Sequence, residues 1–98
     1  MQVTLLYFND CPNWEITSAT LESLAQELGF DLCRQLVETP AEAERLRFRG
    51  SPTVLVDGRD AFADGDRQYA LSCRVYWTEH GLAGAPSERQ LREVLGSG

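Results

Sequence analysis

The stretch of residues 3–29 limits what this chain can fold into more than any other part of the sequence. Residues 3–8 are β-branched, aliphatic or aromatic without interruption, which predicts a strand buried on both faces. Cys11-Pro12 follows, and proline suits the first position of a helix because its missing N–H would be unpaired there anyway. Apolar residues at helical spacing then continue to Leu28, and Gly29 is the expected C-terminal stop. The sequence therefore predicts a buried strand that passes through a cysteine into a helix.

Residues 30–50 predict a second strand and a second helix. Residues 30–37 have the mixed polarity of an edge strand. Thr39-Pro40-Ala41-Glu42 combines a capping box with proline at the first helical position, so a helix is expected to start there. We expect this helix to run to about Arg49 and to end at Gly50.

A hairpin and a last helix are predicted further along. Residues 53–56 read as a strand, Asp57-Gly58 is a strong two-residue turn signal, and residues 59–62 are expected to return as the partner strand. Residues 87–90 form another capping box. The last helix is expected to bury one apolar face, made of Leu91, Val94 and Leu95.

Residues 63–86 are long for a simple connection, and long insertions are often functional. Within them, Asp64-Gly65-Asp66 predicts a turn, residues 74–78 a short strand and residues 81–86 a loop.

The order of predicted elements is β-α-β-α-β-β-α in a single domain covering residues 1–98, with a frayed Gly96-Ser97-Gly98 end. Two βαβ steps predict parallel strands with right-handed crossovers, and the hairpin adds an antiparallel strand. The predicted fold class is α/β, with a mixed four-stranded sheet and helices on both faces.

Composition narrows the function classes. Nine Lys and Arg residues against fifteen Asp and Glu residues give a formal charge of −6, which argues against nucleic acid and anionic membranes as partners. No apolar run approaches the ~20 residues of a membrane span, and the apolar start lacks the basic residues of a signal peptide. We therefore expect a cytoplasmic protein, in which an exposed cysteine is reactive or ligand-binding rather than structural.

The three cysteines stand at positions 11, 33 and 73. An odd number excludes a fully paired disulfide scaffold in a monomer, and these spacings do not resemble zinc-ligand pairs. Cys11 stands at the start of the first helix, where unpaired N–H groups and the helix dipole are expected to lower the pKa of a thiol. Asp10 opposes this by like-charge repulsion unless it serves as a proton donor. The alternative is that Cys11 only caps the helix, although cysteine is a poor cap.

Ser51-Pro52 stands immediately before the predicted strand at residues 53–56. Proline is tolerated at the first residue of a strand, and X–Pro bonds adopt the cis form at low cost. Taken alone, this proline reads better as an ordinary trans residue that separates a helix from a strand.

Together, the cysteine that opens a helix and the Ser-Pro before a hairpin resemble the thioredoxin-like fold in its short, glutaredoxin-like form. The resemblance covers most of the chain and implies a three-layer sandwich. It implies that Cys11 is the nucleophile, that Pro52 is a cis-proline and that Ser51, just before it, helps to present a backbone edge to the substrate. No cofactor is implied, with glutathione or another small thiol as the reductant.

The family's C-x-x-C motif would place a second cysteine at position 14, where this chain has Trp14. A redox cycle would therefore be monothiol, resolved by glutathione or another small thiol, or would use Cys33 or Cys73 across the fold. The wording around Cys11, Pro52 and Cys73 also resembles small bacterial thioredoxin-like proteins that are sometimes labelled alkylmercury lyases.

Other chemistry-bearing residues have competing interpretations. Cys33 is expected to be a small buried residue, and Cys73 is either a resolving thiol or part of the core. Trp14 either shapes a substrate groove beside Cys11 or packs in the core, and His80 is expected in a turn without a catalytic role. A loose calcium-like spacing reads better as a solvated acidic turn, so no metal site is predicted; its members are Asp57, Asp60, Asp64 and Asp66.

Three functions remain open at this point. The first is thiol redox chemistry, by a monothiol oxidoreductase in which Cys11 attacks a disulfide or peroxide and Cys73 or a small thiol resolves the intermediate. The second is binding of mercury, or cleavage of an organomercurial, by Cys11 with Cys73 or Cys33 and Asp10 as proton donor. The third is a non-catalytic binding module. The expected partners are a small thiol or disulfide, or a redox partner protein.

Overall fold

The computed structural model describes residues 1–62 and 69–96 of the 98-residue chain. The turn predicted at Asp64-Gly65-Asp66 and the last two residues of the frayed end lie outside the described residues. The elements follow in the order β1 (Gln2–Tyr7), α1 (Trp14–Leu28), β2 (Asp31–Leu36), α2 (Pro40–Leu46), β3 (Thr53–Val56), β4 (Arg59–Asp60), β5 (Tyr76–Thr78), β6 (Gly81–Ala83) and α3 (Glu88–Gly96).

The main sheet has four strands in the order β2-β1-β3-β4. β1 and β2 are parallel, as predicted, whereas β3 runs antiparallel to β1, so the prediction of a second parallel step was wrong. The reason is the length of α2, whose seven residues rise only about 10 Å while a six-residue strand covers about 20 Å. Because α2 cannot carry the chain back along the sheet, β3 begins beside the end of β1, with Thr53 opposite Leu6.

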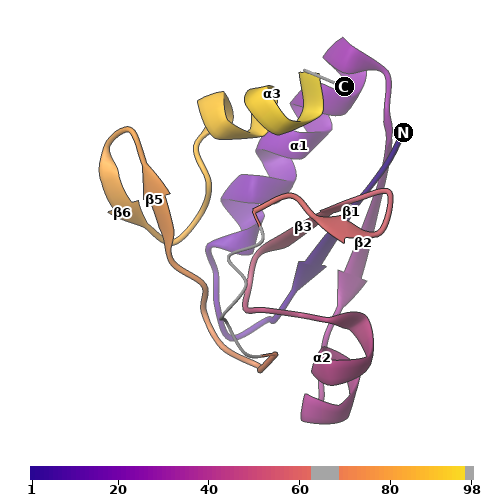
Figure 1. The fold of residues 1–98 in the computed structure, drawn as a ribbon, viewed down its shortest axis with the longest axis vertical. Coiled ribbons are helices and arrows are strands. Elements are labelled where there is room, and N and C mark those ends of the chain that lie inside the picture. The colour runs from indigo at the N-terminus through magenta and orange to yellow at the C-terminus, as the bar shows by residue number, and fades with distance from the viewer. Residues whose placement is uncertain (63–68, 97–98) are drawn as a thin grey trace.

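Alternation along β1 divides the core between the two faces of the sheet. Val3 and Leu5 pack with apolar side chains of α1 and α3, while Leu6 packs with Val37, Ala43 and Phe48 on the α2 side. Figure 1 shows α1 and α3 lying together, with α2 at the far end of the sheet. The molecule is therefore a mixed α/β structure in three layers, with helices on both faces of the sheet.

The capping box at α3 forms in full, with the Ser87 N–H donating back to the Gln90 side chain at 3.0 Å, while at α2 the Glu42 carboxylate accepts the N–H of Glu38 instead of that of the cap residue. The Thr39 hydroxyl accepts the Glu42 N–H at 3.1 Å, and at α3 the Ser87 hydroxyl accepts the Gln90 N–H at 3.2 Å. The predicted ends are less accurate. α1 begins at Trp14 rather than Pro12, and α2 ends at Leu46 because Arg47 adopts a left-handed conformation with φ of 58°.

The region after the Asp57-Gly58 turn differs from the prediction. β4 is only two residues long, because the carboxylate of Asp60 accepts the Phe62 N–H at 2.9 Å and turns the chain out of the sheet. Residues 81–83 were expected in a loop and instead form β6, which pairs with β5. Figure 1 shows that this β5–β6 hairpin stands apart from the main sheet.

Candidate functional site

Cys11 and Cys73 are joined by a disulfide, with 5.7 Å between their Cα atoms and a sequence separation of 62. Cys11 follows β1 in a turn whose N–H donates to the Phe8 carbonyl at 3.0 Å. It is 0% exposed, whereas Cys73 is exposed. Cys33 and Cys73 were both possible partners for Cys11, and the structure joins Cys11 to Cys73.

Ser51 holds the segment that carries Cys73, which we call the strap (Ser72–Arg74). The Ser51 N–H donates to the Ser72 carbonyl at 2.7 Å, and the Arg74 N–H donates to the Ser51 carbonyl at 3.0 Å, so that Ser51 and Cys73 form a parallel bridge. The Ser51 hydroxyl also accepts the Phe8 N–H at 3.1 Å. Ser51 therefore bonds both to the strap that carries Cys73 and to Phe8, whose carbonyl accepts the N–H of Cys11.

The peptide bond between Ser51 and Pro52 is cis, and both residues are buried. The resemblance places these two residues at a substrate-binding edge. In this structure the strap occupies the backbone edge of Ser51, so any external ligand would meet Cys73 and the strap there.

Arg74 anchors the strap from inside the protein, and its side chain is 2% exposed. Its guanidinium makes two hydrogen bonds to the Asp60 carboxylate, at 2.8 and 3.3 Å, and a third to the Phe62 carbonyl at 2.6 Å. It also lies 4.8 Å above the ring of Tyr76. Paired charges of this kind are stable in a protein interior only when most of their hydrogen bonds are made.

This ion pair corrects one expectation. The Asp60 side chain is 4% exposed and bonded to Arg74, so it is not part of a solvated acidic turn. The positive charge of Arg74 is engaged by that carboxylate. Asp57 remains exposed and accepts the Gln2 N–H at 2.9 Å. Within residues 1–62 and 69–96, no group of three or more His, Cys, Asp or Glu residues could hold a metal ion.

Gly50 gives the strap room to approach. Its φ is +111°, and a Cβ built on it would lie 2.9 Å from the Cβ of Arg74. Sequence reasoning assigned this glycine to the end of α2, but the helix has already ended at Leu46. Beyond the strap, the Tyr76 hydroxyl donates to the Pro52 carbonyl, which ties the start of β5 to the same edge.

Trp14 does not lie free beside the disulfide. Its ring stacks on Tyr7 with 4.2 Å between ring centroids, and it packs half-buried against the core of Val3 and Leu5. Packing therefore accounts for much of its surface, and the remaining exposed part is available to a ligand.

Cys33 is free and exposed, so the expectation of a buried packing residue was wrong. It lies on the edge strand β2 opposite Thr4, and its sulfur accepts a hydrogen bond from the Gln2 side chain at 3.3 Å. Alternation from Leu32 to Cys33 in an edge strand is the signal that would have placed it outward. Cys11 lies seven residues after Thr4, beyond the carboxyl end of β1, and Cys33 is not bonded to it. His80 is exposed in the turn between β5 and β6, as expected.

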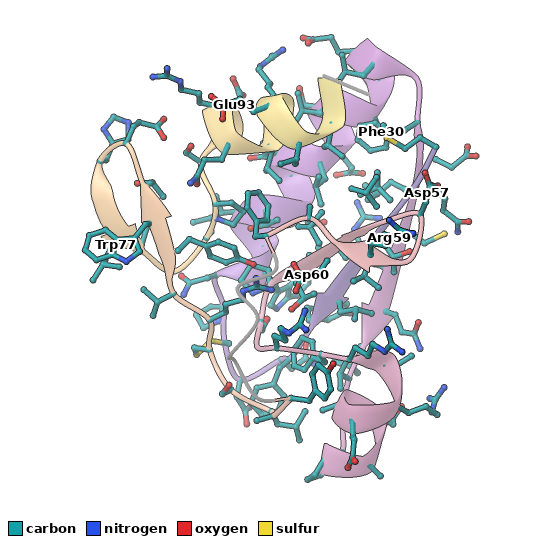
Figure 2. The ribbon with its side chains drawn as sticks, viewed as in Figure 1. Phe30, Asp57, Arg59, Asp60, Trp77 and Glu93 are labelled. Carbon is teal, nitrogen blue, oxygen red and sulfur yellow. A yellow bond between two sulfur atoms is a disulfide. The ribbon has the colours of Figure 1, made fainter. Side chains whose placement is uncertain are left out.

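A groove of about 400 Å³ lies between the strap and the hairpin. Its lining comes from residues 74–77, from β6, from α3 and from the chain just after β4, namely Phe62, Arg74, Val75, Tyr76, Trp77, Leu82 and Gln90. Trp77 is 75% exposed, and Figure 2 shows it on the outer side of the hairpin. A hydrogen bond from the Ser87 hydroxyl links α3 to Glu79 of the hairpin and lowers the pKa of that carboxyl.

Comparison with protein-family models, curated proteins and solved structures gives no match to this chain. No helix in the described part of the chain is both long enough and apolar enough to cross a membrane. The geometry of the disulfide and its supports is therefore the feature that bears on function.

Proposed function

We propose that the chain is a thioredoxin-like thiol redox protein that works by reversible formation of the Cys11–Cys73 disulfide. The observation that carries the proposal is the disulfide between a cysteine at the approach to α1 and a cysteine on the strap. The strand-to-helix position of Cys11 and the buried Ser51-Pro52 edge beside it support the same assignment.

Cys11 and Cys73 together can provide the attacking and the resolving thiol, which a C-x-x-C motif provides from two cysteines three positions apart. In the reduced protein, one thiolate attacks a substrate disulfide, and the other cysteine then attacks the resulting mixed disulfide and releases the second product. Glutathione or another small thiol returns the protein to the dithiol form. We place this cycle in the cytoplasm, where glutathione keeps thiols reduced and a protein disulfide is transient and catalytic rather than permanent.

The test is an assay of thiol–disulfide exchange between glutathione and bis(2-hydroxyethyl) disulfide, followed by NADPH consumption through glutathione reductase. We expect the wild-type protein to accelerate the exchange, and both Cys11→Ser and Cys73→Ser to lose most of that acceleration. Cys33→Ser is the matched control and should retain it, because Cys33 is free and is not part of the disulfide. Equal background rates for all four proteins would contradict the proposal and favour a binding module.

A second candidate uses the same two sulfurs as soft-metal ligands. Thiolates prefer soft ions such as mercury, and Cys11 and Cys73 are close enough to share one atom. Asp10 is exposed near Cys11 and would be the proton donor in cleavage of a carbon–mercury bond. Titration of the reduced protein with mercuric ion tests this candidate. One ion bound per chain with loss of binding in Cys73→Ser supports it, and equal binding by that variant contradicts it.

A further inference from the structure

The two halves of the disulfide differ in their access to solvent. Cys11 is 0% exposed, so its sulfur is fully covered, while Cys73 is exposed. In thiol–disulfide exchange an incoming thiolate must reach one sulfur of the bond, and access is one of the factors that decide which sulfur it attacks. Within the part of the chain that the structure describes, the Cys73 end of the bond is therefore exposed to an outside thiol and the Cys11 end is covered.

The covering of Cys11 is part of the fold. Its turn is closed by the hydrogen bond to Phe8, whose own N–H is held by the buried Ser51 hydroxyl. Pro52 is buried in the same region, and the strap lies across the edge of Ser51. An external thiol would have to displace the strap to reach Cys11.

The strap has supports that do not depend on the disulfide. Arg74 is bonded to Asp60 and to the Phe62 carbonyl, and Ser51 pairs with the strap backbone on both sides of Cys73. Because these contacts do not involve the sulfur atoms, we expect them to hold Cys73 beside Cys11 in the reduced protein as well. The two thiols therefore meet at high effective concentration within one chain.

We propose that Cys73 is the sulfur that exchanges with outside thiols and disulfides, and that Cys11 is the internal resolving cysteine. This inference rests on the proposed redox function and deepens it. It reverses the roles that the resemblance assigns, in which the cysteine before the first helix is the attacking nucleophile.

Exchange at Cys73 needs an external thiol or disulfide as its co-reactant. An external thiolate RS⁻ attacks the Cys73 sulfur, the bond between the two protein sulfurs breaks, and Cys11 leaves as a thiolate while a mixed disulfide forms on Cys73. In the opposite direction, the Cys73 thiolate attacks a substrate disulfide RSSR and releases RS⁻. The Cys11 thiolate then attacks the Cys73 sulfur, which forms the internal disulfide and releases a second RS⁻. Two electrons pass from the protein dithiol to the substrate disulfide.

The experiment identifies which cysteine carries the adduct after attack. Oxidised Cys33→Ser protein is mixed with excess glutathione, quenched with acid at short times, and treated with a maleimide that labels the released thiol. Trypsin cleavage after Arg67 and Arg74 puts Cys73 in its own short peptide, separate from the peptide that contains Cys11. Replacing Cys33 removes the other thiol from the Cys11 peptide, and wild-type protein run in parallel serves as a folding control.

We expect glutathione on Cys73 and maleimide on Cys11 at the earliest times, in excess over the converse by about tenfold or more. Glutathione mainly or equally on Cys11 would overturn this inference and leave the redox function standing. A Cys11–Cys73 bond that does not form, or that forms and does not exchange, would overturn both. A second arm uses glutathione disulfide with the reduced single variants, in which Cys11→Ser should form its adduct on Cys73 faster than Cys73→Ser forms one on Cys11; equal rates, or a faster Cys73→Ser, would contradict the inference.

Discussion

Cys11 and Cys73 are held against each other by two regions of the molecule that are built differently. The Cys11 turn continues from a central strand into the longest helix, and local backbone bonds and the core behind β1 support it. The strap belongs to none of the described strands or helices and is fixed by a single buried arginine and by the backbone of Ser51. The comparison shows how one disulfide can join a buried cysteine to an exposed one. The buried cysteine belongs to the core, and the exposed one lies on a segment that Arg74 and Ser51 hold in place.

The largest expected effect comes from breaking the anchor of the strap. Arg74→Met leaves the Asp60 carboxylate buried without its main partner, which is expected to destabilise the protein by about 3–5 kcal/mol. Urea unfolding of the two proteins measures the difference. Arg89→Met is the control, because the Arg89–Glu93 pair is exposed and should contribute less than about 1 kcal/mol.

A double variant separates the buried charge from the packing. In Arg74→Met the Asp60 carboxylate keeps only the longer contact with the Arg49 guanidinium, at 3.4 Å. Adding Asp60→Asn removes this buried charge and should recover part of the lost stability. Additive effects of the two substitutions would mean that the pair does not anchor the strap.

The disulfide connects the two regions, and its reduction is expected to have the next largest effect. Chain-entropy estimates for a loop of this length give about 4 kcal/mol, and measured values are typically about 2–4 kcal/mol. We therefore expect the midpoint of thermal unfolding to fall by roughly 10–25 °C on reduction. Calorimetry of the protein with and without a reductant measures this shift. The reduced Cys33→Ser variant should behave as the reduced wild-type protein does, and an unchanged midpoint on reduction would show that the strap alone restrains the chain.

Gly50 tests how closely the strap must approach. Gly50→Ala should destabilise the protein by about 2–3 kcal/mol, because the new Cβ meets Arg74 and the backbone lies in a region that favours glycine. Gly29→Ala is the matched control: its φ is also positive but its surroundings are open, so its effect should stay near 1 kcal/mol. Chemical denaturation compares the two, and equal effects would contradict the close approach.

The smallest effect is expected on the hairpin beyond the strap. Trp77 is largely exposed, so Trp77→Ser should change the free energy of unfolding by less than about 0.5 kcal/mol. Urea titration followed by circular dichroism avoids the loss of the tryptophan signal. Surface substitutions usually change the free energy of unfolding by no more than about 0.5 kcal/mol. A change above about 1 kcal/mol would therefore mean that the hairpin supports the strap.

Local patterns in the sequence predicted the region around Cys11 well. The apolar run of β1, the helical spacing of α1 and the two capping boxes are decided by neighbouring residues, and these elements formed near their predicted positions. The same holds for the Asp57-Gly58 turn. The direction of β3 could not be predicted from neighbouring residues. It follows from the length of α2, which ends three residues earlier than expected and leaves β3 antiparallel to β1.

The supports of the strap were not predictable in this way. Arg74 lies fourteen positions after Asp60, beyond a poorly patterned segment, and no short motif relates the two residues. The role of Gly50 is visible only once Arg74 is seen packed against it. Sequence reasoning left Cys73 open as a resolving thiol or a core residue, because only the course of the chain brings it to Ser51 and Cys11.

The most direct test of a reversible Cys11–Cys73 couple is a redox titration of the native protein. Samples are equilibrated with buffers of defined ratios of glutathione to glutathione disulfide, quenched with acid, labelled at free thiols and mapped by mass spectrometry. The account predicts that Cys11 and Cys73 lose and regain their label together, as one two-electron couple, while Cys33 follows its own course. Cys11 and Cys73 that titrate independently, or that remain unchanged across the whole range, would contradict it.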